Sequence, residues 1–173
     1  MFSNPEKNLK VFGLKEDSIV ADLGAGTGYY AIAAGRLAPQ GKVYAIEIEK
    51  DYLDTIRHKV AEAGLGNVEI IWGNVEKSGG TKLSDGVADV VIASNILFQV
   101  EDKNAFIEEA RRVLKQSGRV LLSDWAEKSI MSKVAVSKAR ARQMFEQKGF
   151  AFDREIDTGE QHYGMIFRKQ EKI

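Results

Sequence analysis

The stretch Val20-Ala21-Asp22-Leu23-Gly24-Ala25-Gly26-Thr27-Gly28-Tyr29-Tyr30 carries three glycines in five positions, directly after an apolar run. The apolar run is typical of a buried strand, and we expect a helix from about Gly28 to Leu37. The glycines therefore occupy a turn from a strand to a helix. In an open α/β sheet, ligands bind in the crevice that such a turn can open. Because glycine has no Cβ atom, a ligand can rest almost on the backbone at this turn.

Short apolar runs of this kind alternate with longer amphipathic segments from residue 18 to about residue 124. The runs are nearly continuous, as expected for parallel strands that are covered on both faces. We expect five strands, at Ser18 to Leu23, Lys42 to Glu47, Val68 to Trp72, Ala88 to Ser94 and Arg119 to Asp124. Strands that alternate with helices in this way indicate a doubly wound parallel sheet.

Two of the intervening segments have apolar residues at helical spacing. In the first, Leu53 to Ala63 present one apolar face, and Gly64 suits a left-handed helix end. In the second, the apolar face of residues 106–114 follows Asp102, which can cap a helix. Glu108 and Arg112 are spaced for an i,i+4 ion pair in that second helix.

The pattern changes after Trp125. Residues 128–148 predict a basic amphipathic helix with Val134, Ala141 and Phe145 on one face. Two strands follow, at Ala151 to Ile156 and at Gln161 to Arg168. Consecutive strands joined by a short turn are antiparallel, so we expect the sheet to end in a hairpin. The predicted fold class is α/β, with a doubly wound and mostly parallel sheet.

The composition limits the kinds of partner. The 173 residues include 25 Lys and Arg and 25 Asp and Glu, so the formal net charge is zero. No overall field attracts nucleic acid or an anionic membrane, and the basic residues of 128–148 are expected to form a solvated helix face. The chain has no cysteine and two distant histidines, which argues against a metal site.

The length suits a single domain over residues 1–173. Its start lacks the basic and apolar parts of a signal peptide, and no apolar run approaches the roughly 18 residues that span a bilayer. We therefore expect a cytoplasmic protein without membrane insertion. Residues 1–16 are expected to form an N-terminal cap segment, and residues 125–148 an acceptor-side helix, with no separate lid domain. We expect the site to be open to solvent, and to be closed by the N-terminal segment, by a large substrate or by a second subunit. The sequence is also compatible with a homodimer.

An acidic residue narrows the class of ligand. Gly24, Gly26 and Gly28 read G-x-G-x-G, whereas a dinucleotide fingerprint reads G-x-G-x-x-G and holds a pyrophosphate. Glu47 lies 19 residues beyond Gly28, at the end of the expected second strand. An acid there can accept both ribose hydroxyl hydrogens and would repel a 2′-phosphate. We therefore expect an adenosine-containing ligand with free ribose hydroxyls.

Five motifs in order then resemble a known family. They are Asp22 to Gly28, Glu47, Gly73-Asn74-Val75, Asp89 to Asn95, and Arg112 to Arg119. In sequence and spacing they are similar to those of class I S-adenosylmethionine-dependent methyltransferases, over roughly residues 10–125. The resemblance implies S-adenosylmethionine as cofactor and a seven-stranded sheet of order 3-2-1-4-5-7-6, whose antiparallel seventh strand the terminal hairpin would supply.

The resemblance also implies a role for each matching residue. Asp22 would contact the methionine amine, and Gly24, Ala25, Gly26 and Gly28 would line the cofactor bed. Glu47 would hold the ribose, and Ile48, Asn74 and Val75 would contact the adenine. Ser94 or Asn95 would lie near the methionine moiety and the transferred methyl group. Asn74 departs from the aspartate most common in the family, but its amide can still form a hydrogen bond to the adenine amine.

The acceptor side is less defined. Asp124 and Trp125 end the expected fifth strand and either wall the acceptor pocket or serve as a helix cap and a core aromatic. The sequence identifies no catalytic residue, and Asp124 and His162 are weak candidates for a general base. The fourth strand lacks the Asn-Pro-Pro-Tyr run of enzymes that methylate flipped bases.

Ser94 to Val100, followed by Asp102, resembles the small-molecule branch of the family, which includes quinone-biosynthesis and arsenite enzymes. The arsenite enzymes use cysteines, which this chain lacks. We expect transfer of a methyl group to a small-molecule acceptor. The alternatives are a methyltransferase of protein or RNA, and a non-catalytic S-adenosylmethionine-binding partner subunit.

Overall fold

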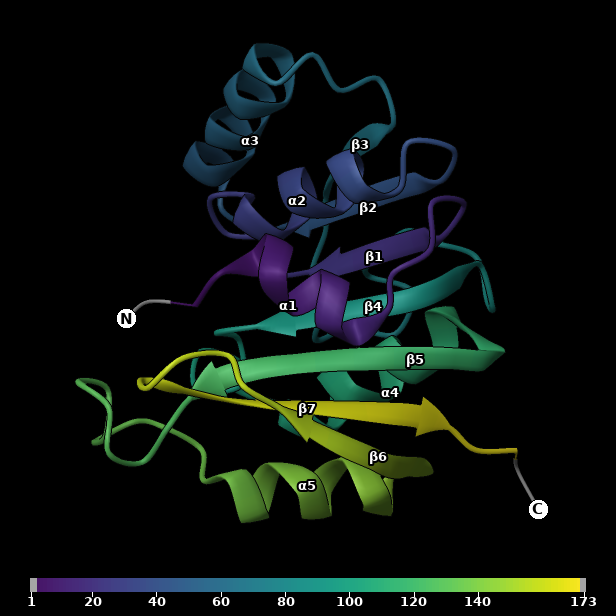
Figure 1. The fold of residues 1–173 in the computed structure, drawn as a ribbon. Helices are drawn as coiled ribbons and strands as arrows, with labels where there is room; N and C mark the ends of the chain where they lie inside the picture. The colour runs from purple at the N-terminus through teal and green to yellow at the C-terminus, as the bar shows by residue number, and fades with distance from the viewer. Residues whose placement is uncertain (1–2, 172–173) are drawn as a thin grey trace.

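The computed structural model describes residues 3–171, and these form a seven-stranded sheet. The strands are β1 (Ile19–Leu23), β2 (Lys42–Glu47), β3 (Val68–Trp72), β4 (Ala88–Ser94), β5 (Leu114–Trp125), β6 (Phe150–Ile156) and β7 (His162–Lys169). Their order is β3-β2-β1-β4-β5-β7-β6 (Figure 1). The first five strands are parallel, and β7 pairs antiparallel with both β5 and β6. The predicted fold class and strand order are confirmed.

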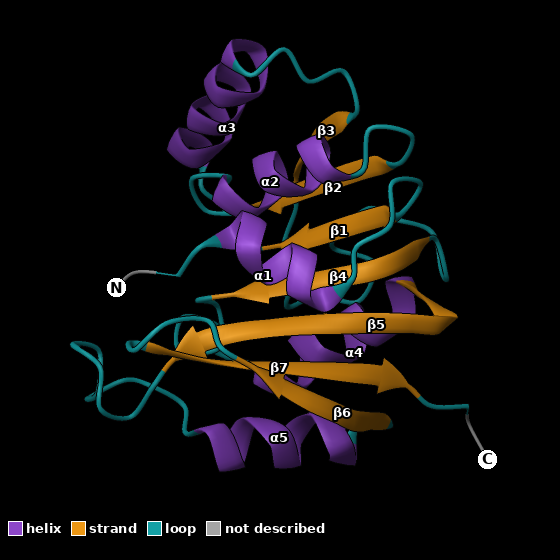
Figure 2. Ribbon diagram, viewed as in Figure 1, coloured by secondary structure: helices purple, strands orange, loops and turns teal. Residues whose placement is uncertain are grey.

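Helices cover both faces of the sheet (Figure 2). They are α1 (Pro5–Phe12), α2 (Tyr29–Leu37), α3 (Lys50–Glu62), α4 (Lys103–Val113) and α5 (Lys138–Gln147). One apolar core lies between the sheet and α1, α2 and α3, and the other lies between the sheet and α4 and α5. Because the central strands contribute side chains to both cores, their sequences are apolar at nearly every position.

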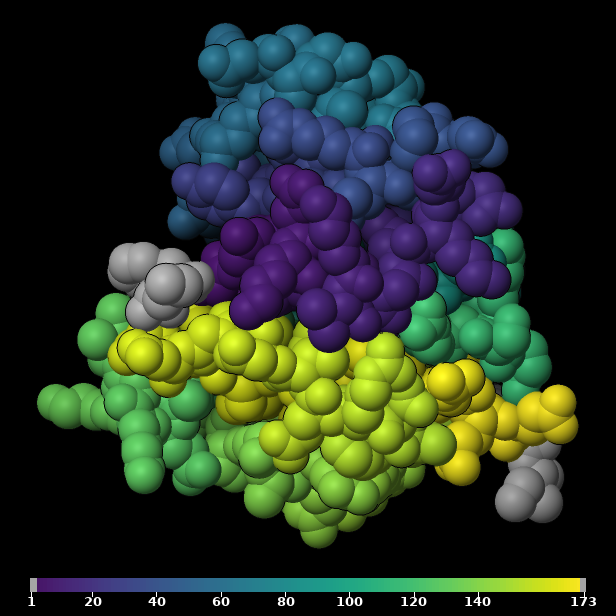
Figure 3. All heavy atoms as spheres, viewed as in Figure 1, coloured from purple at the N-terminus to yellow at the C-terminus, as the bar shows by residue number. Residues whose placement is uncertain are grey.

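The N-terminal segment contains a helix that packs across the sheet. Asn4 caps α1 by accepting a hydrogen bond from the Lys7 amide, and Leu9 and Phe12 are fully buried. The Arg119 guanidinium of β5 donates to the Phe12 carbonyl oxygen and lies over the Phe12 ring. In the space-filling view, α1 lies between the first half of the sheet and the terminal hairpin (Figure 3). The expected cap segment of residues 1–16 is thus largely this helix, while residues 1, 2, 172 and 173 lie outside the described residues.

The prediction of a helix over residues 128–148 is wrong in its first half. α5 begins only at Lys138, and residues 126–137 form turns and irregular backbone. Ile130 is 76% exposed and Val134 is 52% exposed, so these side chains do not bury an apolar stripe. Most of the stability of a protein helix comes from packing such a stripe, and residues 126–137 lack one. The acceptor-side segment is therefore a loop followed by a shorter helix.

β5 also begins earlier than expected. The prediction placed its start at Arg119, whereas the strand follows α4 directly, at Leu114. Leu114 pairs with Ala88 of β4, and the register then shifts before regular pairing resumes between Val90 and Arg119. This irregular pairing extends the strand through residues 115–118, whose polar sequence resembles a loop.

A buried carboxylate connects α4 to the loop that follows β3. The carboxylate oxygens of Glu109 accept hydrogen bonds from the Gly79 and Thr81 amides, the Thr81 hydroxyl and the Arg112 guanidinium, at 2.6–3.2 Å. Burial by itself would raise the pKa of Glu109, but the hydrogen bonds from Arg112, Thr81 and Gly79 outweigh it and lower that pKa to about 2. The same loop continues from Asn74, so Glu109 helps to position the edge of the site described below.

This network replaces the predicted ion pair between Glu108 and Arg112, which is wrong. Arg112 instead pairs with Glu109 and with Asp85, and Glu108 pairs with Lys148. Of the two glutamates, the Arg112 guanidinium binds the buried Glu109 rather than the exposed Glu108, because the charge interaction is stronger away from water.

We predict that Glu109→Gln lowers the free energy of unfolding by about 2 kcal/mol at pH 7, because it leaves the Arg112 guanidinium without its buried partner. The pKa of Glu109 in the folded protein lies below its ordinary 4.5. The stabilisation is therefore present above pH 4.5 and is lost as the pH falls towards 2. Denaturant unfolding at pH 7 and pH 3 measures this difference.

Glu108→Gln is the matched control, because it changes the exposed neighbour on the same helix. We expect it to change the free energy of unfolding by less than about 1 kcal/mol. Equal destabilisation by the two substitutions at pH 7 would contradict the role given to Glu109.

Candidate functional site

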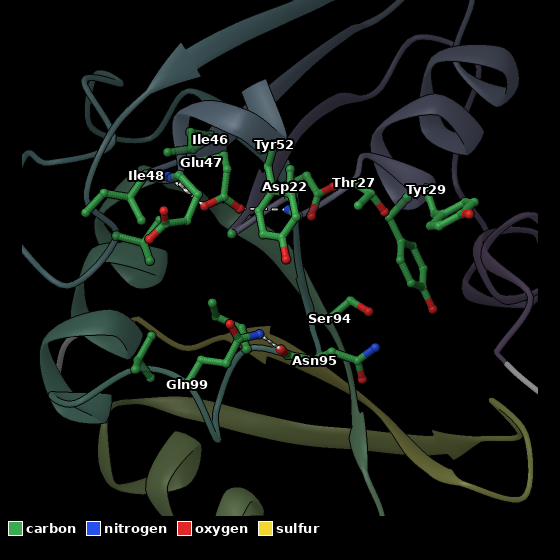
Figure 4. A pocket seen from close by; sticks show the side chains of 18 of the residues that line it. Asp22, Thr27, Tyr29, Ile46, Glu47, Ile48, Tyr52, Ser94, Asn95 and Gln99 are labelled. Atoms are coloured by element: carbon green, nitrogen blue, oxygen red, sulfur yellow. Dashed lines mark hydrogen bonds between the residues drawn. The ribbon is translucent and has the colours of Figure 1, made fainter. Parts of the chain in front are cut away.

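The carboxyl ends of β1, β2 and β4 border a cavity of about 900 Å³. Figure 4 shows Asp22, Glu47 and Tyr52 on one side of it and Ser94 and Asn95 on the other. Ten of the eleven residues predicted for cofactor binding line this cavity, namely Asp22, Gly24, Ala25, Gly26, Glu47, Ile48, Asn74, Val75, Ser94 and Asn95. The eleventh, Gly28, does not. One cavity thus brings together residues from four separate segments of the chain.

The three glycines of the first turn serve different purposes. A Cβ atom on Gly24 would lie 2.5 Å from Cδ1 of Ile96, and one on Gly28 would lie 3.0 Å from Cγ1 of Ile56. A Cβ atom on Gly26 would meet no atom within 4 Å, although its φ of +54° is strained for any other residue. Gly24 and Gly28 are therefore favoured by close packing within the protein and by their positive φ values of +75° and +83°. Gly26 borders the open space of the cavity.

Glu47 joins the end of β2 to the glycine turn. Its Oε2 accepts a hydrogen bond from the Gly26 amide at 2.8 Å, and its Oε1 accepts from the Ile48 and Glu49 amides at 2.8 and 3.0 Å (Figure 4). A carboxylate oxygen can accept two hydrogen bonds, so Oε2 retains capacity for a hydroxyl donor in the cavity. The residue is buried but lines the cavity.

Asp22 has a buried oxygen that lacks a partner. Asp22 is the last residue but one of β1, and its Oδ2 forms no hydrogen bond with any described residue. Burial first, and then the nearby charge of Glu47, raise the pKa of Asp22 to about 7. Buried carboxylate oxygens in folded proteins are nearly always satisfied, so this one needs a donor from outside the chain. An ammonium group in the cavity would supply both the hydrogen bond and a positive charge.

The loop after β3 closes one edge of the cavity. Asn74 Oδ1 accepts a hydrogen bond from the Glu76 amide at 2.9 Å, and the Asn74 amide donates to the Gly80 carbonyl oxygen. This turn holds the Asn74 side chain by its oxygen and places both Asn74 and Val75 against the cavity. Ile48, which is about half exposed, lies across from them as an apolar surface.

Comparison with known proteins identifies the family. The family described as "Methyltransferase domain" matches residues 14–170. This chain belongs to that family. The match confirms the resemblance carried by the motifs around Asp22, Glu47 and Asn74.

A solved structure supports the assignment. The structure titled as a SAM dependent methyltransferase from Aquifex aeolicus is 28% identical, with a TM-score of 0.87, and the alignment covers 96% of this chain and 90% of that one. The ubiquinone/menaquinone biosynthesis C-methyltransferase of Pasteurella multocida is 33% identical over 66% of this chain and 42% of that protein. The arsenite methyltransferase of Halobacterium salinarum is 30% identical over 61% of this chain and 26% of that protein. The alignments thus span between a quarter and a half of these two curated relatives.

Asp124 of this methyltransferase domain lies outside the cavity lining. Its carboxylate is fully buried, where Oδ2 accepts hydrogen bonds from the Ile96 and Leu97 amides and Oδ1 accepts from the Trp125 amide, at 2.8–3.0 Å. Burial raises the pKa of Asp124, and these hydrogen bonds oppose the rise. The arrangement favours the second interpretation of Asp124, a cap, here of the loop that carries Asn95.

Trp125 and His162 do line the cavity. They are directly opposite each other on β5 and β7, and their rings lie 4.3 Å apart at an interplanar angle of 30°. Neither ring nitrogen of His162 has a hydrogen-bond partner among the described residues. Burial lowers the pKa of His162. The two residues form a wall of the cavity on the side away from Glu47.

Several lining residues were not predicted as site residues. They include Ser3, Pro5, Thr27, Tyr29, Tyr52 and Gln99. Thr27 lies within the glycine motif, and Tyr52 lies in the first turn of the helix after Glu47, so the sequence carries a signal for both. Ser3 and Pro5 reach the cavity only because α1 folds back across α2, where the Asn8 side chain donates to the Tyr30 hydroxyl.

The described residues contain no group of three or more His, Cys, Asp or Glu side chains arranged to hold a metal ion. In the same part of the chain, every helix is too short or too polar to cross a bilayer.

The unpartnered carboxylate predicts how stability depends on pH. Because the pKa of Asp22 in the folded protein lies above its ordinary 3.8, the folded state binds the proton more tightly than the unfolded state. Asp22 therefore destabilises the ligand-free fold increasingly as the pH rises from about 4 to above 7. We predict that Asp22→Asn raises the free energy of unfolding by about 1–3 kcal/mol at pH 8, and that the gain disappears towards pH 4.

Thermal unfolding of the ligand-free protein at pH 8, 6 and 4.5 measures this effect. Asp17→Asn is the control, because Asp17 is exposed and lies on the loop before β1. If the two variants respond to pH in the same way, Asp22 does not carry the proposed electrostatic strain.

Proposed function

We propose that this chain transfers a methyl group from S-adenosylmethionine to a small-molecule acceptor. The observation that carries the proposal is the unpartnered oxygen of Asp22 beside Gly26 and Glu47 in one cavity. This set of groups fits the methionine ammonium and the ribose of the donor. The match to a methyltransferase-domain family over most of the chain supports the same reaction class.

Each part of the donor has a complementary group in the cavity. The ammonium would bind the Asp22 carboxylate, and a ribose hydroxyl would donate to Oε2 of Glu47, which Gly26 already holds in place. The adenine would lie against Ile48 and Val75, with its edge at Asn74. Binding of the ammonium would satisfy Asp22 and lower its pKa, because a positive charge favours the ionised carboxyl.

The bound donor supplies a methyl group on a positively charged sulfur, and the reaction is an in-line displacement. The protein's contribution is alignment, which can lower such a barrier by about 7 kcal/mol or more. In this chain, Asp22 and Glu47 would fix the two ends of the donor, and Ser94 and Asn95 would border the transferred group. Asp124 would keep these two residues in place by holding the Ile96 and Leu97 amides.

The small-molecule acceptor is favoured over a macromolecule by the size of the cavity and by the names of similar proteins. A cavity of about 900 Å³ can hold the donor and a small second molecule. By their names, two similar proteins act on a quinone precursor and on arsenite. The absence of cysteine from the chain argues against arsenite chemistry here. The cytoplasmic location and the possible homodimer stay predictions.

Two alternatives remain, a methyltransferase of protein or RNA and a non-catalytic partner subunit that only binds S-adenosylmethionine. Incubation with radiolabelled S-adenosylmethionine and separate pools of metabolites, RNA and protein distinguishes them. We expect label in the metabolite pool. Label in either macromolecular pool alone would replace the proposed acceptor class, and binding without any transfer would favour the partner subunit.

We predict that Gly26→Ala weakens S-adenosylmethionine binding at least tenfold, because its Cβ atom would enter the cavity where the donor is proposed to lie. Gly64→Ala is the matched control, since Gly64 has a similar φ of +63° and equally open surroundings, but lies at the end of α3 away from the cavity. Both substitutions are expected to lower the free energy of unfolding by about 1 kcal/mol.

Isothermal titration calorimetry with S-adenosylmethionine measures the affinities. We expect the Gly64→Ala protein to bind as the unsubstituted protein does. Absence of binding to the unsubstituted protein would refute the proposed donor. Equal affinity of the two variants would show that the donor does not lie against Gly26.

A further inference from the structure

The charged side chains that line the cavity are all acidic. Asp22, Glu47, Glu49, Glu76 and Glu101 contribute carboxylates, whereas no Lys or Arg is among the lining residues of the described chain. Lys59 lies over the ring of Tyr29 but donates to the Thr27 carbonyl oxygen and does not line the cavity. A carboxylate or phosphate on an acceptor would therefore find no basic side chain to pair with and several like charges, which is unfavourable in a partly buried site.

The sheet topology places His162 on the acceptor side of this cavity. β7 runs antiparallel to β5, so its first residue, His162, lies at the same edge of the sheet as the last residues of β4 and β5. The proposed donor site lies at the ends of β1 and β2, on the other side of β4. An acceptor between these two halves would meet the donor from one direction and His162 from the other.

The imidazole of His162 is held in place but has no internal partner. It is 8% exposed, packs on the Trp125 ring, and has no hydrogen bond at either ring nitrogen among the described residues. The charged side chains nearest to His162 on β5 and β7 form no hydrogen bond with its ring nitrogens. Asp124, one residue before Trp125, points to the opposite face of the sheet, where three backbone amides bind it.

Burial keeps this imidazole neutral. The pKa of His162 is lowered by burial, with no charged neighbour contributing to the shift. Across the cavity, Asp22 and Glu47 are the carboxylates that face the donor position. A neutral ring nitrogen can accept a proton. The Asp124 carboxylate is poorly placed to do so, because it already accepts three hydrogen bonds from backbone amides.

We propose that His162, with its ring fixed against Trp125, accepts the proton from the hydroxyl group of an uncharged acceptor. This inference rests on the proposed methyl transfer and specifies its acceptor class and its base. As the hydroxyl oxygen bonds to the methyl carbon, the bond from that carbon to sulfur breaks and its electron pair stays on sulfur. The hydroxyl proton moves to a ring nitrogen of His162 and then to water, so the positive charge of the sulfonium leaves as that proton.

The two histidines of the chain make a direct test possible. An NMR spectrum of the imidazole carbon-bound protons contains signals from His162 and His58 alone, and His58 is exposed on α3. The protein is loaded with S-adenosylhomocysteine, which carries no methyl group to transfer, and titrated with 2-naphthol or with 2-naphthoate. These probes share a ring system and differ in a neutral hydroxyl against a carboxylate.

We expect 2-naphthol to shift the His162 signal and to leave the His58 signal unchanged. The carboxylate probe is expected to bind at least tenfold more weakly. Equal affinity for the two probes, or a His162 signal that 2-naphthol leaves unmoved, overturns the inference. Spectra of His58→Gln and His162→Gln assign the two signals.

Calorimetry with S-adenosylhomocysteine separates this inference from the proposed function. No binding in that measurement rejects the donor site itself, whereas binding followed by no response of His162 to 2-naphthol rejects only the acceptor proposal. In the radiolabel assay with the metabolite pool, His162→Gln is expected to slow transfer on the order of 100-fold or more with donor affinity within about twofold. His58→Gln is expected to match the unsubstituted protein, and equal rates in the two variants contradict the role of His162 as base.

Discussion

The hydrogen bond from the Gly26 amide to Oε2 of Glu47, 2.8 Å long, joins the two strands on which the site depends. β1 and β2 are paired in register, so their carboxyl ends arrive together at one edge of the sheet. Backbone amides of Gly24 and Ala25 also donate to the Ile46 carbonyl oxygen, which fixes the glycine turn against β2. With three backbone amides bound to Glu47, this carboxylate is positioned before any ligand arrives.

The two carboxylates of the proposed donor site differ because both oxygens of Glu47 accept hydrogen bonds from backbone amides, whereas Oδ2 of Asp22 accepts none. Glu47 is neutralised in part by the amides of its own loop, whereas Asp22 is left buried with an unpartnered oxygen and a pKa of about 7. The fold tolerates this cost because β1 is held by neighbours on both sides. A cationic ligand would remove this cost on binding, so the strain at Asp22 would contribute to the affinity for an ammonium group.

The other half of the cavity combines one of the family's motifs with elements outside them. The motif at the end of β4 supplies Ser94 and Asn95, and the antiparallel hairpin supplies His162 beside Trp125. Ser3 and Pro5, at the start of α1, also line the cavity. The proposed donor site is therefore built from segments that lie between residues 22 and 75, whereas the proposed acceptor side combines residues that are up to about 160 positions apart.

The sequence by itself determined the strands, their parallel arrangement, the terminal hairpin and the cluster around Asp22 and Glu47. These features depend on local periodicity and on motif spacing, both of which are visible along one dimension. Only the tertiary structure decided that residues 126–137 are not helical, since that depends on whether Ile130 and Val134 find a surface to pack against. The tertiary structure also decided that Asp124 caps a loop and that His162 lines the cavity. Which face of the sheet borders the cavity depends on how the neighbouring helices and loops pack against it, and the sequence pattern of one strand does not show this.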